Sequence, residues 1–142
     1  MRLIQFNIVT QEGVVYESEA TQITLPTTSG EVSILPHHAP LVSLVSPGTV
    51  MIKKIDGEHL VSVARGILEV RHDSKVIILA ESAERAETID LERAEAARAR
   101  AQQVITEKEK LSNEAFAAVQ AQLEKEIARI KVGRRYRKLP PL

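Results

Sequence analysis

The sequence predicts an α+β protein in which an N-terminal antiparallel β-sandwich or barrel is followed by a C-terminal antiparallel two-helix hairpin. Up to about residue 84, apolar and polar residues alternate in short runs separated by turn signals, which is the period of strands. From 83 to 131 there is no Gly and no Pro, and Ala, Glu, Arg, Lys and Gln dominate, which is typical of helices. We therefore expect a sandwich domain over residues 1–84 and a helical hairpin with a basic tail over residues 85–142.

Short strands are expected throughout the first domain. The strand pattern covers residues 3–8, 22–25, 49–53, 59–63, 67–71 and 75–79. Between two of these segments, Asp56-Gly57 predicts a tight hairpin. Residues 30–40 predict a short strand that enters a rigid turn at a sheet edge, because Pro36 and Pro40 restrict the backbone. Aromatic residues make up 3% of the chain and Trp is absent, so we expect an aliphatic core.

Two helices are expected in the second domain. Thr88 or Asp90 can cap the first helix, which we expect to run to about Lys110. Ser112-Asn113 can cap the second helix, and Gly133 is expected to end it. The second helix has an apolar stripe, which consists of Phe116, Val119, Leu123, Ile127 and Ile130. The facing side of the first helix is Ala94, Ala97, Ala101, Val104 and Ile105. Because alanine buries little area, we expect a thin interface and a hairpin that can detach.

Composition and charge exclude several classes of protein. The chain has no Cys, which excludes disulfides and thiolate chemistry, and its longest apolar runs are far too short to span a bilayer. With an N-terminus that alternates, a soluble cytoplasmic protein is expected. The net charge of zero divides into −3 over residues 1–83 and +3 over residues 84–142. The basic excess near the C-terminus is either a solvated tail or a surface that attracts an acidic partner.

The sequence offers few sites for chemistry. The pair His37-His38 makes a poor chelate, because adjacent residues of a strand point to opposite faces. No nucleophile elbow, no phosphate-binding loop with its lysine and no aromatic interleaving for nucleic acid is present. We therefore predict no catalytic residue, no metal site and no nucleic-acid partner, and we expect that the chain is not an enzyme on its own.

One group of arginines remains. Arg93 and Arg100 are two helical turns apart, so they share a face on which the small Ala97 leaves room for a flat or phosphorylated ligand. On the second helix, Arg129 could face the same groove if the hairpin closes. Guanidinium groups suit phosphate oxygens because their donors are fork-shaped and permanently charged. The alternative is ordinary surface pairing between these arginines and acidic neighbours such as Glu92.

Three motifs in the sequence are similar to motifs of a known protein family. Residues 30–42 are similar to Gly-x-Leu-Gly-Ile-Leu-Pro-x-His-x-Pro-Leu, and residues 65–70 are similar to Gly-Gly-Phe-Leu-Glu-Val. Residues 76–84 then lead into Ile-Asp-x-x-Arg-Ala at 89–94. In this order the motifs resemble the epsilon subunit of bacterial and chloroplast F-type ATP synthases over nearly the whole chain. The chain departs from the family pattern at Ser33 and Arg65, where the family commonly has glycine, and in a longer, more basic tail.

The resemblance implies a non-catalytic rotor subunit of the proton-translocating ATP synthase. Such a subunit packs on the gamma subunit and the c-subunit ring, on the cytoplasmic face of the plasma membrane or the stromal face of the thylakoid. Its C-terminal helices restrain ATP hydrolysis by opening along gamma towards an acidic segment of beta, beside alpha. The residues that the resemblance suggests for these interfaces are Glu31, His38, Arg98, Arg134 and Arg135.

The resemblance also implies a nucleotide site, since some family members bind ATP in the folded hairpin. The residues that match or resemble those contacts are Glu84, Ile89, Asp90, Arg93, Ala94, Arg100 and Arg129. Lys125 stands where an arginine is expected, which predicts weak affinity because lysine is a point charge. No cofactor is required, and ATP is the regulatory ligand to test. The competing hypotheses are a domain whose main role is to sense ATP, and an unrelated adaptor of the same architecture.

Overall fold

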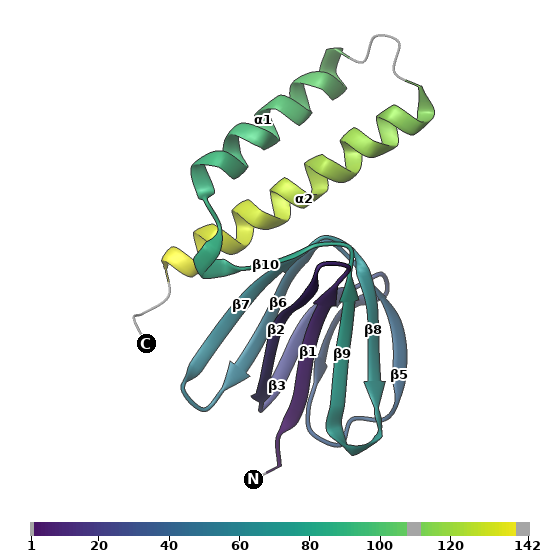
Figure 1. Ribbon diagram of the computed structural model, residues 1–142, viewed down its shortest axis with the longest axis vertical. Helices are drawn as coiled ribbons and strands as arrows, with labels where there is room; N and C mark the ends of the chain where they lie inside the picture. The colour runs from purple at the N-terminus through teal and green to yellow at the C-terminus, as the bar shows by residue number, and fades with distance from the viewer. Residues whose placement is uncertain (1, 108–111, 139–142) are drawn as a thin grey trace.

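Ten strands form one sheet that closes on itself into a sandwich, with a helical hairpin packed on one side (Figure 1). The computed structural model describes residues 2–107 and 112–138. The strands are β1 (Ile4–Thr10), β2 (Gly13–Ala20), β3 (Gln22–Thr27), β4 (Gly30–Ile34), β5 (Leu41–Val45), β6 (Gly48–Lys54), β7 (Gly57–Val63), β8 (Gly66–Arg71), β9 (Lys75–Ala80) and β10 (Ala83–Arg85). The predicted fold class, a sandwich or barrel followed by two helices, is confirmed.

The strand order of the sheet is β10-β7-β6-β3-β5-β8-β9-β1-β2, with β4 paired to β3. Among the described residues, the paired strands are antiparallel except β1 and β9, which run parallel. The two end strands meet, because Arg85 Nε of β10 donates to the carbonyl of Val15 in β2 at 3.1 Å. The Arg85 guanidinium also lies 5.0 Å over the ring of Tyr16. This side chain therefore helps to close the sheet.

A single aliphatic cluster fills the sandwich, as the composition predicts. Inward positions alternate most clearly in β3, where every second side chain is buried, whereas the last four residues of β7 are all buried. The cluster joins residues of β1 to β9, with Phe6 and Tyr16 as its aromatic members. Their rings lie 6.0 Å apart, in a tilted arrangement that favours aromatic contact.

Two predicted turns form as expected. Lys54 pairs with Gly57 across the β6–β7 hairpin, and Gly57 has a φ of 135°, which glycine tolerates best. After β4 the chain enters the proline-bracketed turn, where His37 has a φ of 66°. The backbone N–H of His37 donates to Ser74 Oγ at 2.8 Å, which braces this turn against the β8–β9 connection, the 3₁₀ turn η1 (His72–Ser74).

The two helices are α1 (Leu91–Glu107) and α2 (Asn113–Arg137), and the 3₁₀ turn η2 (Ala86–Thr88) leads into them. Of the two predicted caps for α1, Asp90 is the one used, since its Oδ1 accepts from the Arg93 N–H at 3.1 Å. The Thr88 hydroxyl instead donates to the Arg85 carbonyl. Ser112 caps α2 as predicted. The expected end of the first helix at Lys110 lies outside the described residues.

The prediction that Gly133 ends the second helix is wrong, because α2 continues to Arg137. Gly133 is buried, and a Cβ at this position would lie 3.1 Å from Leu91 Cδ1 and 3.3 Å from Ile89 Cγ2. The glycine therefore allows the segment before α1 to approach the α2 backbone closely, rather than providing a left-handed helix terminus.

α2 lies between the sandwich and α1, which packs on the outer side of α2 (Figure 1). Towards the sandwich, Val132 joins a small cluster with Leu60, Ala86, Met51 and Ile89. Towards α1, Ile130 packs with Leu91 and Ala94. Both clusters are small, and the one between the helices agrees with the thin interhelical interface that the alanine-rich sequence predicts.

The predicted apolar stripe of α2 is only partly buried. Leu123 and Ile130 are buried, whereas Phe116 is 41% exposed and Ile127 is 42% exposed. A helix with two neighbours, the sandwich and α1, buries residues on two sides, so a single stripe does not describe it. Near the tip of the hairpin, Val104 of α1 is also 40% exposed, which leaves the distal half loosely packed.

Candidate functional site

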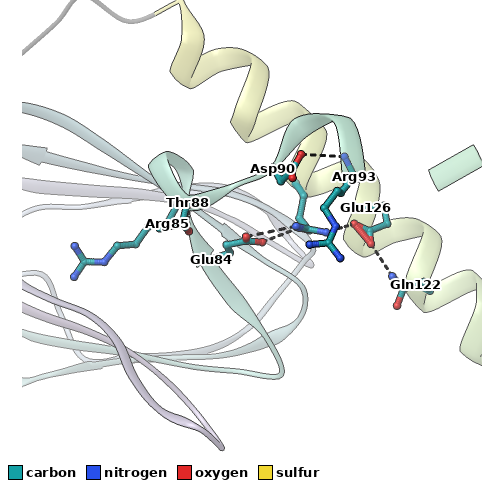
Figure 2. Close-up of polar contacts among 8 residues, drawn as sticks. Glu84, Arg85, Thr88, Asp90, Arg93, Gln122 and Glu126 are labelled. Atoms are coloured by element: carbon teal, nitrogen blue, oxygen red, sulfur yellow. Dashed lines mark hydrogen bonds and ion pairs between the residues drawn. The ribbon is translucent and has the colours of Figure 1, made fainter. Parts of the chain in front are cut away.

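A cluster of charged side chains joins α2 to the end of the sandwich (Figure 2). Arg129 Nε lies 2.7 Å from Glu84 Oε2 in β10, and Arg129 Nη2 lies 3.4 Å from Glu84 Oε1. On the other side, Arg129 Nη1 donates to Glu126 Oε1 at 2.5 Å. Arg129 therefore links two carboxylates that are far apart in the sequence.

Glu126 is the most buried member of this cluster, with 2% of its surface exposed. Its second oxygen accepts from Gln122 Nε2 at 2.6 Å, so both carboxylate oxygens have partners. The sequence prediction missed Glu126, because a glutamate in an Ala-, Glu- and Lys-rich helix normally faces solvent. The one available signal was spacing, since Gln122, Glu126 and Arg129 share a helix face at i, i+4 and i+7.

Two opposing effects act on the charge of Arg129. Burial disfavours the guanidinium, but the hydrogen bonds to Glu84 and Glu126 outweigh this effect, and the pKa of Arg129 lies above its usual value. Arg129 thus stays protonated and compensates two carboxylates with one positive charge. Removal of Arg129 would leave Glu126 buried without a cation, which is a costly state for a carboxylate.

The predicted 89–94 segment adjoins this cluster (Figure 2). Ile89 packs against the Leu60 cluster, and Ala94 is buried against Ile130. Asp90 caps α1 through the Arg93 N–H, and the side chain of Arg93 is exposed. The fold therefore brings Glu84, Arg129 and the 89–94 segment together where the sandwich meets the hairpin. We call this region the hinge cluster: Glu84, the 89–94 segment, Glu126 and Arg129.

Arg100 lies away from the hinge cluster, in a shallow groove of about 330 Å³ between the two helices. The groove is lined by Ala97, Arg100, Ala101, Val104, Ala118, Val119 and Gln122. Gln122 belongs to both places, because it lines the groove and donates to Glu126. The small alanines make room beside Arg100, as the sequence suggests, and Gln122 connects this room to the hinge cluster.

A second surface feature is an apolar row across the outward face of the sandwich. Leu44 pairs with Ile67, Ile67 pairs with Leu79, and Leu79 pairs with Val9, so four neighbouring strands contribute. Leu44 is 59% exposed, Leu79 is 51% exposed and Ile67 is 43% exposed. With Ile127 of α2, this apolar row lines a cleft of about 1180 Å³ between the sandwich and the helix. The sequence does not single out these residues, since the same strands also supply the core.

Comparison with known proteins matches the chain to one family along nearly its whole length. Residues 3–86 match the family described as ATP synthase, Delta/Epsilon chain, beta-sandwich domain, and residues 87–133 match ATP synthase, Delta/Epsilon chain, long alpha-helix domain. The chain belongs to the ATP synthase delta/epsilon chain family. The resemblance to epsilon subunits is thus confirmed, and with it the expectation of a subunit of ATP synthase rather than an enzyme in its own right.

Bacterial members of the family are similar to this chain along most of their length. The ATP synthase epsilon chain of Dehalococcoides mccartyi strain BAV1 is 39% identical over 140 residues, which covers 99% of each chain. That of Bacillus subtilis strain 168 is 46% identical over 103 residues, 72% of this chain and 77% of the relative. A chain of the Euglena gracilis mitochondrial ATP synthase OSCP/F1/c-ring structure has the same fold, with a TM-score of 0.74 and 20% identity over 90% of this chain and 79% of that one.

Two residues that the epsilon resemblance assigns to interfaces lie in different places, one on β4 and one beyond it. Glu31 is exposed and pairs with Pro26 near the start of the strand. His38 is half-buried in the turn beyond the strand, and its Nδ1 lies 2.7 Å from the Ala39 carbonyl oxygen. Glu31 is about 10 Å from the end of β4, at roughly 3.3 Å per residue. Glu31 therefore lies on the strand and His38 in the turn that follows it.

The basic residues predicted to meet an acidic partner lie on the surface of this epsilon-family chain. Arg98 is exposed on α1. Arg134 Nη2 lies 2.9 Å from Glu95 Oε1 of α1, and Arg135 Nη2 lies 3.9 Å from Met51 Sδ of β6. In the closed hairpin, the last turn of α2 is therefore tied to both of its neighbours. No described helix is long and apolar enough to span a bilayer.

Proposed function

We propose that this chain couples the gamma subunit to the c-subunit ring in the central stalk of an F-type ATP synthase, and that its helices restrain ATP hydrolysis. Family membership supports the subunit assignment. A solved structure of the Tetrahymena thermophila ATP synthase central stalk and c-ring contains a chain with the same fold, at a TM-score of 0.62 and 13% identity. The complex would act at the cytoplasmic face of the plasma membrane, or at the stromal face of the thylakoid in a chloroplast.

The observation that carries the proposal is the apolar row of Val9, Leu44, Ile67 and Leu79. Monomeric proteins rarely leave large apolar side chains in register across several strands, and such patches mark protein interfaces. In a rotor, such a surface would hold the sandwich on gamma without covalent links. Co-purification with gamma of the same organism tests this assignment, and a chain that does not associate with gamma would contradict it.

Contact with the c ring is assigned to polar residues of the 30–40 segment. Glu31 is exposed and ionisable, and the His37 turn beside His38 is braced by Ser74. A rigid polar edge suits the loops of a rotating ring, because torque requires a contact that does not deform. Weaker assembly of c-ring complexes with a Glu31→Ala variant would support the assignment.

The restraint of hydrolysis is assigned to an opened hairpin. α1 is held mainly by α2, and the clusters that hold α2 are small, so opening exposes little apolar surface. Once α2 leaves its neighbours, Arg134 and Arg135 lose the contacts with Glu95 and Met51 and become free for an acidic segment of beta, beside alpha. Arg98 of α1 adds to the same positive surface.

A second candidate function, the sensing of ATP by the closed hairpin, is favoured by the hinge cluster. Glu84 and Arg129 are paired there, Asp90 caps α1 through the Arg93 N–H in the adjoining segment, and Arg100 lines the groove that Gln122 connects to the cluster. Lys125 offers a point charge rather than a fork, so we expect weak binding. Titration of ATP into the full chain tests this function. If Arg93→Ala and Arg100→Ala leave the measured binding unchanged, the arginines are not the site.

A further inference from the structure

Within the hairpin, Glu126 accepts a hydrogen bond from Arg129 and balances part of its charge. The guanidinium of Arg129 has five N–H donors, and its Nε, Nη1 and Nη2 atoms already donate to Glu84 or Glu126. Glu126 is held in place from the other side by Gln122, and both of its oxygens are used. Its side chain is almost completely buried. An external anion at the hinge cluster would therefore meet a cation whose charge is already compensated.

Glu126 also lies on the path from the interhelical groove to Arg129. The groove beside Arg100 ends at Gln122, and Glu126 follows one helical turn later on the same face of α2. Phosphate groups that reach from Arg100 towards Arg129 would approach the carboxylate of Glu126. The negative charges of the phosphate groups and of the Glu126 carboxylate repel each other, most strongly where water is excluded.

We propose that Glu126 is an internal competitor of polyphosphate: it holds Arg129 in the closed hairpin in place of an external phosphate group. This proposal rests on the ATP-sensing candidate described above, and it adds a residue that limits the affinity of that site. The hairpin then closes without a ligand, and a nucleotide binds well only when Glu126 is displaced or neutralised. Glu126 would thus lower the affinity of the chain for nucleotide.

The test measures binding of ATP and of inorganic triphosphate to the full-length chain by calorimetry. Glu126→Gln keeps the size of the side chain and its capacity to accept from Gln122, but it removes the negative charge. We expect both ligands to bind about tenfold more tightly, or better, to this variant than to the unchanged chain. A gain for both ligands supports competition between Glu126 and the phosphate chain, whereas a gain for ATP alone contradicts it.

The matched control is Glu124→Gln, which removes the same charge two residues away on α2. Glu124 pairs with Arg65 at 2.7 Å, outside the hinge cluster, so its loss should leave the affinity unchanged. Adding Arg129→Gln to Glu126→Gln should abolish the gain. Circular dichroism and thermal unfolding establish that each variant is folded, and Glu126→Ala serves as a second charge-free variant. Equal affinity of Glu126→Gln and the unchanged chain, or no binding by either, overturns the proposal. Because gamma association is measured separately, such a result leaves the rotor function standing.

Discussion

Gly133 of α2 faces Leu91 at the start of α1 so closely that a methyl group at position 133 would lie 3.1 Å from Leu91 Cδ1. Few real Cβ contacts are that short, and Ile89 lies nearly as near. The hairpin and the segment that leads into it are therefore in tight contact beside the hinge cluster. Small changes there should act on hairpin closure rather than on the sandwich.

We expect Gly133→Ala to destabilise the closed hairpin. At an exposed helix position, the change would stabilise by about 0.5–1 kcal/mol, but here the added methyl displaces Leu91 and Ile89, at a cost of about 1–3 kcal/mol. Hydrogen exchange of the α1 amides would report the net loss. In a Leu91→Ala background only the contact with Ile89 Cγ2 at 3.3 Å remains, so the same substitution should cost less than in the unchanged chain. A stabilising effect in the unchanged background would contradict the crowding.

Arg129→Gln should loosen α2 from the sandwich, because it leaves Glu126 buried without a positive charge. Breaking a buried ion pair from one side costs about 3–5 kcal/mol, and some relaxation of the partly exposed Glu84 side reduces this figure. Faster hydrogen exchange along α2, with an unchanged sandwich core, is the expected readout. The control is Arg134→Gln, whose pair with Glu95 is exposed and contributes about 0–1 kcal/mol. Equal effects of the two variants would refute the special role of Arg129.

Ile67→Glu should weaken association with gamma, because it places a charge in the centre of the apolar row. Desolvating that carboxylate without a partner raises the dissociation constant by about tenfold or more. Ile55 provides the control, since it is 80% exposed in the β6–β7 loop, away from the row. Pull-down of gamma with Ile55→Glu should match the unchanged chain. If Ile67→Glu retains full gamma affinity, another surface carries the interface.

Truncation after Thr88 should leave a folded sandwich that still binds gamma. Thr88 is the appropriate end, because β10 completes the pairing with β7 and Arg85 helps to close the sheet. The reconstituted complex should then hydrolyse ATP faster, since the helices that we propose to restrain hydrolysis are missing. The ATPase rate of complexes with the full and the truncated chain measures this effect. An unchanged rate would remove the inhibitory role.

Tyr16→Phe should be nearly neutral at pH 7 and should reduce the loss of stability at high pH. The Tyr16 hydroxyl is buried without a hydrogen-bond partner in the described residues, so its removal costs less than about 1 kcal/mol. Burial is the main reason that the pKa of Tyr16 is raised. As the pH rises past about 10, the unfolded chain loses this proton first, which favours unfolding. Urea unfolding from pH 7 to 11 should show a steeper decline for the unchanged chain than for Tyr16→Phe.

Much of the fold was predictable because local signals decide it. Asp56-Gly57 forces a hairpin by backbone freedom, and Ser112 caps a helix by the reach of its hydroxyl. The parallel pairing of β1 with β9 was not predictable, because alternation says which face a residue takes but not which strand lies beside it. Gly133 misled the prediction for a related reason. A glycine signals either a helix end or a close approach, and only the tertiary contact with Leu91 decides between them.

Some features of the candidate site could also be predicted from the sequence, and others could not. The placement of Glu84 and Arg129 at one point follows the resemblance, and the structure adds a direct ion pair between them. Glu126 was missed because a sequence gives no measure of burial for a single charged residue in a helix. Arg65, noted as a departure from the family pattern, is ion-paired to Glu124, a contact that joins the sandwich to α2.

The parallel pair has a consequence for biosynthesis. β1 lies between β2 and β9, so the first strand gains its second neighbour only after about seventy more residues have been made. Until then, the edge of β1 stays open, and pairings of such separation are slow to form. We expect the sandwich of the nascent chain to close late, shortly before the helices are added. Mutations that slow this closure would lower the yield of assembled rotor without altering any interface.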